Sequence, residues 1–241
     1  MTEELFRDDA TLTTCEATVV ALESIDGQAG VLLDRTVFYP LGGGQAGDAG
    51  SLRDDRGTEW RVVDTRKSKA HPGAVLHLLA PGSAAPEPGT RVQAAIDVAR
   101  RRAHMRLHTA THLLCALVPY PVDGCSITAG YARLDFHTAE PIDKEALNAG
   151  LARLVSEAHV VRHRWIDESE LDANPGLVRS MSVQPPRGLG RVRVLEIDGV
   201  DLQPCGGTHV GNTLDVGGVV VTKIEKKSAL TRRVVLGFAD G

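Results

Sequence analysis

Two pairs of metal-binding residue types, each pair spaced four residues apart, constrain the fold of this chain more than any other feature. His108 and His112 lie in the run RLHTATHLL, and Cys205 and His209 lie far downstream in PCGGTH. On a helix, side chains at positions i and i+4 share one face, so two imidazoles there can reach one ion. The glycines of the second motif let the backbone curl so that its thiolate and imidazole point the same way.

Three imidazoles and one thiolate form a donor set that suits Zn²⁺ in tetrahedral geometry. Either pair alone is common by chance, so the prediction of one zinc site depends on the occurrence of both. His104 and Cys115 compete as donors, and we interpret Cys115 as a small core residue and His104 as a solvent or outer group. Thr109 stands where a zinc protease of the HExxH type has its base glutamate, which disfavours peptide hydrolysis. The spacing leaves open whether the zinc is structural or catalytic.

The first part of the chain has the pattern of a β-barrel. Residues 15–22 and 30–34 flank the turn Asp26-Gly27, which is typical of a hairpin, and residues 60–64 and 74–79 predict two more strands. A Pro- and Gly-rich stretch at 80–89 precedes an alternating run at 91–97. We predict a small β-barrel domain over residues 1–97, which includes a Gly-rich motif at 42–50.

The second part mixes helix and strand patterns. Residues 99–118 lack Gly and Pro and stop at Pro119, and residues 142–159 carry the apolar stripe of a second helix. Strand-like runs follow at 160–166, 192–197, 216–225 and 233–238. We predict an α+β domain over residues 98–241 that holds the zinc site, and α+β as the class of the whole chain.

Charge limits how this protein could bind RNA. The formal net charge of the 241 residues is −4, whereas a protein that coats itself with nucleic acid is normally basic. RNA binding would therefore need a local basic patch. Because a run of charged residues is often only a solvent-exposed face, we expect about half of the residues in such a patch to contact RNA. Aromatic residues make up 4% of the chain, which disfavours stacking on many bases. The candidate patch comprises Arg100, Arg101, Arg102 and Arg106 with Lys223, Lys226, Lys227, Arg232 and Arg233.

The four cysteines, Cys15, Cys115, Cys125 and Cys205, do not have the spacing of a disulfide framework. The first residues are acidic and lack the apolar core of a secretion signal. No run approaches the ~20 apolar residues that a membrane span needs. We expect a cytoplasmic protein with reduced thiols and no membrane partner, either a monomer or a homodimer.

These motifs resemble a known family. HTATHLL and PCGGTHV are similar to the editing domain of alanyl-tRNA synthetases and above all to the freestanding AlaX-type alanyl-tRNA editing proteins; threonyl-tRNA synthetase has a related editing domain. Residues 38–50 resemble the family's Gly-rich motif, residues 132–136 its RLDF strand, and residues 216–234 its C-terminal hairpin. The resemblance covers roughly residues 10–240 and fits the medium-length form, which has a barrel and an editing domain. Residues 123–128 depart from it, because the family often has a Gln there.

The resemblance implies a zinc-dependent aminoacyl-tRNA hydrolase that acts on the acceptor end of mischarged tRNA(Ala), chiefly the seryl form and in some members the glycyl form. Thr109 would discriminate serine from alanine through its hydroxyl, unless it is only a helix residue bonded to its own backbone. The Gly-rich motif could cradle a phosphate with its N–H groups or merely pack as a tight loop. The metal ligands would be His108, His112, Cys205 and His209, and the expected substrate or tRNA contacts are Gly42, Gly43, Gly44, Gln45, Asp135, Arg102 and Arg106.

Two other classes of function fit the same residues. One is a non-catalytic tRNA-binding module whose zinc only folds the domain. The other is a zinc hydrolase or acyltransferase that acts on a different aminoacyl ester. If the protein is a hydrolase, zinc could activate water, polarise the ester carbonyl or only orient the substrate.

Overall fold

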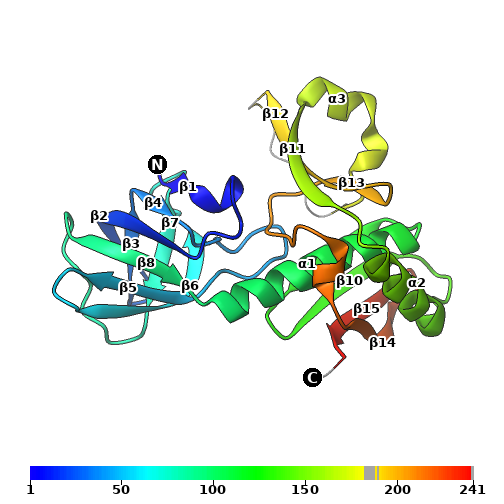
Figure 1. Ribbon diagram of the computed structural model, residues 1–241, viewed down its shortest axis with the longest axis horizontal. Coiled ribbons are helices and arrows are strands. Elements are labelled where there is room, and N and C mark those ends of the chain that lie inside the picture. The colour runs from blue at the N-terminus through cyan, green and yellow to red at the C-terminus, as the bar shows by residue number, and fades with distance from the viewer. Residues whose placement is uncertain (182–187, 189, 240–241) are drawn as a thin grey trace. The chain divides into compact units, whose positions relative to one another are not determined.

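The computed structural model describes residues 1–181, 188 and 190–239 (Figure 1). It is a mixed structure of mostly strands with three α-helices, as the predicted α+β class requires. By contacts the chain divides into two compact units, Met1–Gly42 with Ala46–Arg102, and Gly43–Gln45 with Ala103–Gly241. Three residues of the Gly-rich motif are thus grouped with the C-terminal unit, whereas the rest of the motif belongs to the N-terminal one.

The N-terminal unit is a closed barrel of six strands in the order β2-β3-β7-β6-β5-β8, and every pair in it is antiparallel. A parallel pair, β1 with β4, and the 3-10 helix η1 complete this unit. The predicted small barrel is therefore confirmed. Its elements are β1 (Glu3–Glu4), η1 (Leu5–Arg7), β2 (Thr14–Ile25), β3 (Gln28–Leu33), β4 (Arg35–Thr36), β5 (Gly50–Asp54), β6 (Glu59–Lys67), β7 (Val75–Leu79) and β8 (Arg91–Ile96).

Local sequence explains how this barrel closes. The turn between β2 and β3 has positive φ angles of 51° at Asp26 and 80° at Gly27, as a two-residue hairpin turn needs. At Gly50, where β5 pairs with β8, a Cβ would lie 2.1 Å from the Ala95 carbonyl oxygen, so only glycine allows this approach. Buried apolar side chains such as Val31, Leu52 and Val92 fill the interior.

The C-terminal unit holds a four-stranded sheet, β14-β15-β10-β9, and a three-stranded sheet, β11-β12-β13. The helix α2 packs against β14 (Figure 1), where the Asn148 side chain accepts from the Val221 N–H at 2.7 Å. No helix among the described residues is long and apolar enough to cross a membrane. The elements are α1 (Val98–Leu117), β9 (Val122–Ile127), β10 (Tyr131–His137), α2 (Lys144–Ser156), β11 (Val161–Asp167), α3 (Glu168–Ala173), η2 (Pro175–Leu177), β12 (Arg191–Ile197), β13 (Asp201–Pro204), η3 (Thr213–Val216), β14 (Val219–Ser228) and β15 (Thr231–Phe238).

Two predicted boundaries were wrong for reasons visible in the backbone. The helix predicted over 142–159 is Lys144–Ser156, because the Asp143 side chain caps its first N–H groups and Ala158 has a φ of 56°. The strand predicted from 216 begins at Val219, because residues 213–216 form η3 and Gly217 follows with a φ of 63°. Both changes come from terminators that apolar periodicity alone does not show.

Candidate metal centre

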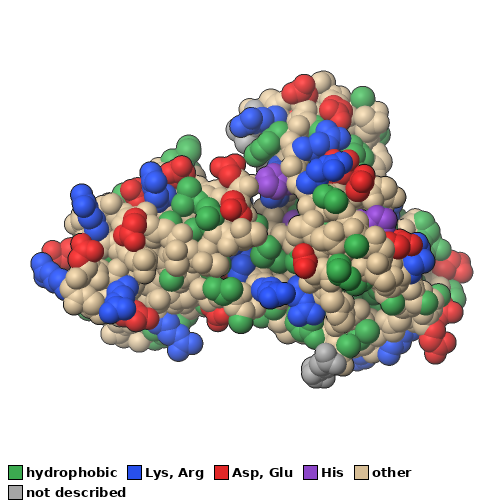
Figure 2. Space-filling view, viewed as in Figure 1, with side chains coloured by type: hydrophobic (Ala, Val, Ile, Leu, Met, Phe, Trp, Pro, Cys, Tyr) green, Lys and Arg blue, Asp and Glu red, His purple; other side chains and the backbone are tan. Residues whose placement is uncertain are grey.

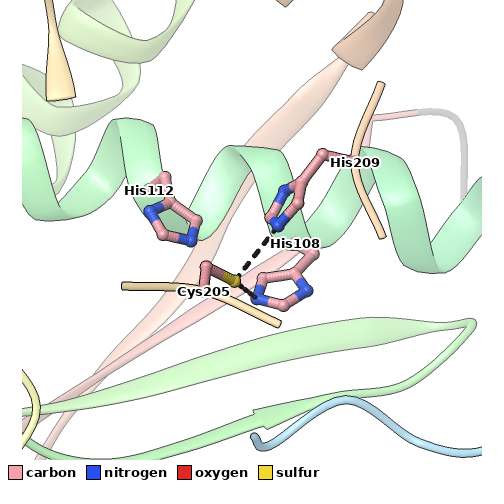
Figure 3. A group of neighbouring side chains, drawn as sticks. All are labelled: His108, His112, Cys205 and His209. Atoms are coloured by element: carbon pink, nitrogen blue, oxygen red, sulfur yellow. Dashed lines mark hydrogen bonds between the residues drawn. The ribbon is translucent and has the colours of Figure 1, made fainter. Parts of the chain in front are cut away.

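One face of α1 carries both helix histidines, and the loop after β13 brings the second motif to them (Figure 3). The rings of His108 and His112 are 5.5 Å apart between centroids, and His209 lies 4.3 Å from His108 and 5.1 Å from His112. One possible ligand atom from each of His108, His112, Cys205 and His209 lies within 4.8 Å of the others. The structure therefore brings together the two motifs that the sequence analysis paired.

The donor atoms converge on the thiol. Cys205 Sγ lies 3.5 Å from His108 Nε2 and 3.2 Å from His209 Nε2. Glycine at position 207 makes this approach possible, because a Cβ there would lie 2.1 Å from His108 Cε1. The Gly-rich character of the PCGGTH motif thus has a steric cause next to the ligand itself.

Each imidazole has a hydrogen-bonding partner at its other nitrogen. His112 Nδ1 lies 2.9 Å from Asp201 Oδ2, and His108 Nδ1 lies 2.8 Å from Gln45 Oε1. His209 Nδ1 lies 3.3 Å from the hydroxyl of Thr109, which also accepts from the Val210 N–H at 3.3 Å. Such partners fix ring orientation in metal sites and leave Nε2 to face the ion.

Charge in the cluster favours a bound cation. Burial opposes ionisation of Cys205, but its electrostatic interactions with His108 and His209 outweigh the effect of burial and hold the pKa of the thiol well below its usual range. Burial also acts to lower the pKa of His112, but hydrogen bonds to Asp201 and Cys205 raise this pKa to about 10. A thiolate and the Asp201 carboxylate thus place negative charge beside the buried imidazoles, which favours binding of a divalent cation.

The donor set fits zinc. Three buried imidazoles and one half-buried thiol, with hydrogen bonds from two of the imidazoles to a carboxylate and an amide, match what Zn²⁺ takes in proteins. Cys115 and His104, the competing donors, are not part of this group. Burial raises the pKa of Cys115 to about 12, so its sulfur remains a neutral thiol, as a core residue should.

The remaining predicted contact residues have diverse environments. Gly42 accepts from the Tyr39 hydroxyl at 2.8 Å, and Gly43 and Gly44 have positive φ angles of 58° and 85°. Gln45 is fully buried, so its amide faces the metal cluster rather than solvent. Asp135 accepts both Nε and Nη2 of Arg233 at 2.7 Å, and this pair lowers the pKa of its carboxyl.

The predicted basic patch needs correction at Arg101. This side chain is 3% exposed and binds the Asp48 carboxylate and the Val37 and Ala10 carbonyls, so its charge is not available to phosphate. Arg106 is half-buried, donating to the Val216 carbonyl at 2.8 Å and covering the Phe238 ring, whereas Arg102 is exposed. The three lysines of the predicted patch, Lys223, Lys226 and Lys227, are exposed. On the face drawn in Figure 2, basic and acidic side chains are interspersed.

The sequence analysis missed Asp201, the carboxylate behind His112. It lies at the start of β13, four residues before Cys205. A carboxylate shortly before a metal-binding motif was the available signal, because imidazole ligands commonly donate their second N–H to such a group.

Fold and site together define a protein with a β-barrel unit and a mixed α/β unit that carries a buried candidate metal centre. Residues 192–235 match the model of the threonyl and alanyl tRNA synthetase second additional domain, and residues 8–100 match that of the class II (A) tRNA synthetases. Over its full length the chain is 33% identical to the whole alanyl-tRNA editing protein AlaX-M of Methanosarcina acetivorans. It is also 33% identical to AlaX-M of Saccharolobus solfataricus over 97% of this chain and 98% of that protein. The chain therefore belongs to the AlaX-M family of alanyl-tRNA editing proteins.

A second group of relatives is much longer. The alanine–tRNA ligase of Haloquadratum walsbyi is 31% identical over 99% of this chain, which corresponds to 26% of that enzyme. The similarity to these ligases thus concerns one part of a larger protein.

Proposed function

We propose that this protein is a trans-editing hydrolase that deacylates mischarged tRNA(Ala), chiefly the seryl form and also the glycyl form. The supporting observation is the full-length similarity to AlaX-M proteins, whose name states alanyl-tRNA editing, in a chain that clusters His108, His112, Cys205 and His209. The scissile bond is the ester between the amino acid and the 3′-terminal ribose. The partner is the acceptor end of tRNA(Ala).

The proposed metal is Zn²⁺, held by the four clustered side chains. A zinc ion at such a site supplies Lewis acidity toward a carbonyl or a bound water. Other side chains of the protein orient the ligands, since Asp201, Gln45 and Thr109 each contact the Nδ1 atom of one imidazole. Burial of the three imidazoles limits their contact with bulk water.

Thr109 is the proposed discriminator between serine and alanine. Its side chain is fully buried in α1 between the two helix histidines, and its hydroxyl already contacts His209 and the Val210 N–H. A polar group beside the ligands that pairs with a serine hydroxyl would be left without that partner when alanine enters. Unpaired buried polar groups of this kind reject the smaller substrate strongly.

A deacylation assay tests the proposal. The zinc-loaded protein is offered tRNA(Ala) charged with serine, glycine or alanine, before and after treatment with a chelator and after zinc is restored. Hydrolysis of the seryl and glycyl esters that stops with chelation and returns with zinc is expected, with the alanyl ester spared. Binding of all three without turnover would instead indicate a tRNA-binding module, and turnover of an unrelated aminoacyl ester alone would indicate a different hydrolase.

A further inference from the structure

One buried side chain of the Gly-rich motif, that of Gln45, contacts the candidate metal centre. Gln45 is 0% exposed, and its Oε1 lies 2.8 Å from His108 Nδ1. The same oxygen accepts from the Thr208 N–H at 3.1 Å, and Gln45 Nε2 donates to the Thr208 hydroxyl at 2.9 Å. Gln45 Oε1 therefore contacts both His108, a candidate ligand, and the loop that carries Cys205 and His209, whereas Gln45 Nε2 contacts that loop alone.

These contacts determine which nitrogen of His108 carries the proton. A backbone N–H can only donate, so the amide atom that faces Thr208 N must be the oxygen. That oxygen can only accept, so His108 Nδ1 must be the protonated nitrogen. The lone pair of His108 is then on Nε2, the atom that lies 3.5 Å from Cys205 Sγ. Gln45 thus favours the tautomer whose Nε2, the nitrogen nearest Cys205, is free to bind a metal.

The backbone around Gln45 is hydrogen-bonded to the C-terminal unit, to which the metal-centre residues also belong. The Gly44 carbonyl accepts from the Ile127 N–H at 2.7 Å, and Gln45 forms a parallel bridge with Ile127. Gly44 has a φ of 85°, and a Cβ there would lie 2.9 Å from Cys125 Sγ and 3.1 Å from the Cys125 carbonyl oxygen. Glycine is needed here so that the chain can approach β9 closely enough to place the next side chain on His108.

We propose that Gln45 is a positioning residue for the metal centre, and that segment Gly43–Gln45 is part of that centre rather than a cradle for phosphate. Because the segment binds His108 and the Thr208 loop together, zinc binding and docking of the segment stabilise each other. The inference rests on the proposed zinc site and extends it to a residue outside the four ligands.

Zinc affinity of a Gln45→Met variant tests the positioning role. Methionine keeps the approximate volume of glutamine but removes all three hydrogen bonds of the amide, so zinc should bind about 10- to 100-fold more weakly in competition with a chelating dye. The visible spectrum of the Co²⁺-substituted variant should shift, because His108 no longer has a fixed orientation. Gln45→Glu keeps an acceptor toward His108 Nδ1 and should recover most of the affinity.

A matched control separates this effect from general loss of an amide. Gln28 is half-buried in the barrel and donates to the Leu79 carbonyl at 2.7 Å, so Gln28→Met removes a similar hydrogen bond far along the chain from the cluster. This control should leave zinc affinity and the Co²⁺ spectrum unchanged. Hydrogen exchange of residues 43–47 in the native-sequence protein should also become faster when zinc is removed.

The outcomes distinguish the two levels of the proposal. If the native-sequence protein binds zinc and Gln45→Met binds it equally well with the same Co²⁺ spectrum, the role of Gln45 is overturned while the zinc site stands. If the native-sequence protein binds neither Zn²⁺ nor Co²⁺, the proposed metal centre is overturned, and the positioning role with it. A folded Gln45→Met variant with weakened binding, beside an unaffected Gln28→Met, supports the inference.

Discussion

Asp201 Oδ2 accepts a hydrogen bond from His112 Nδ1 at 2.9 Å, with both side chains more than nine-tenths buried. A carboxylate in this position fixes the ring and increases the basicity of the nitrogen that faces the cluster. This relationship gives the candidate metal centre a partner that can be changed without touching a ligand.

Replacing Asp201 with alanine should weaken zinc binding by about 10- to 100-fold, because His112 loses its orientation and its negative partner. The measurement is a chelator-competition titration of the purified variant. Asp198→Ala is the matched control, since Asp198 precedes β13 and its side chain is 64% exposed. Equal weakening in both variants would contradict a specific role for Asp201.

Thr109→Val should still bind zinc, though more weakly because His209 Nδ1 loses its partner. It should lose the preference for seryl over alanyl tRNA(Ala), because valine has the shape of threonine without its hydroxyl. The measurement is the ratio of deacylation rates on the two substrates, with zinc content determined on the same sample. Thr109→Ser restores a hydroxyl and should restore the preference. An unchanged ratio in the valine variant would show that serine is recognised elsewhere.

Arg101→Met should destabilise the protein by about 3–5 kcal/mol, because it leaves the buried carboxylate of Asp48 without its cation. In the structure this guanidinium also binds the Val37 carbonyl at 2.6 Å and the Ala10 carbonyl at 2.8 Å. Urea unfolding followed by circular dichroism measures the change. Arg153→Ala breaks the exposed helical pair with Glu157 and should change stability by no more than about 0.5 kcal/mol. Similar losses in both variants would argue against the buried pair as the cause.

His77 should make the barrel sensitive to acid. It is fully buried between the Thr36 hydroxyl and the Val31 carbonyl, and burial lowers its pKa to about 4. The unfolded chain, in which histidine titrates near its usual 6.5, binds the proton first as the pH falls. Stability should therefore decline between pH 6.5 and about 4, by about 3 kcal/mol in total from this group.

Unfolding measured across this pH range checks the effect, with His77→Gln expected to flatten the slope. Exposed His71, whose side chain is 52% exposed, provides the control as His71→Gln. A native-sequence slope that His77→Gln leaves intact would assign the acid sensitivity to other groups.

Sequence patterns predicted most of the helices and strands because short-range features, such as helix breakers and turn residues, determine where these elements begin and end. The helix α1 has no breaker before Pro119, and the Asp26-Gly27 turn adopts the conformation that its residues favour. Strand β5 was missed because its first residue is Gly50, and glycine is typical of loops. Glycine is required at this position only because the Ala95 carbonyl lies so close. Such a cause is tertiary and leaves no periodic signal.

The same distinction applies to the site. The four clustered residues were predictable because each pair has a spacing that aligns two donors on one local structure. The positions of Gln45 and Asp201 depend on long-range packing, since Gln45 is 63 residues before His108 and Asp201 is 89 residues after His112. Whether Thr109 acts in discrimination, and whether Arg102 or Arg106 contacts tRNA, remain predictions.

The separation of the two motifs along the chain has a consequence for biosynthesis. His108 and Cys205 are 97 residues apart, so a ribosome that adds about 5–20 residues per second makes the thiol roughly 5–20 s after the first imidazole. During that interval the nascent chain contains His108 and His112 but neither Cys205 nor His209. The complete donor set exists only after His209 has been added, so stable metal loading must follow synthesis through residue 209. A product truncated before Cys205 would contain only half of the donors.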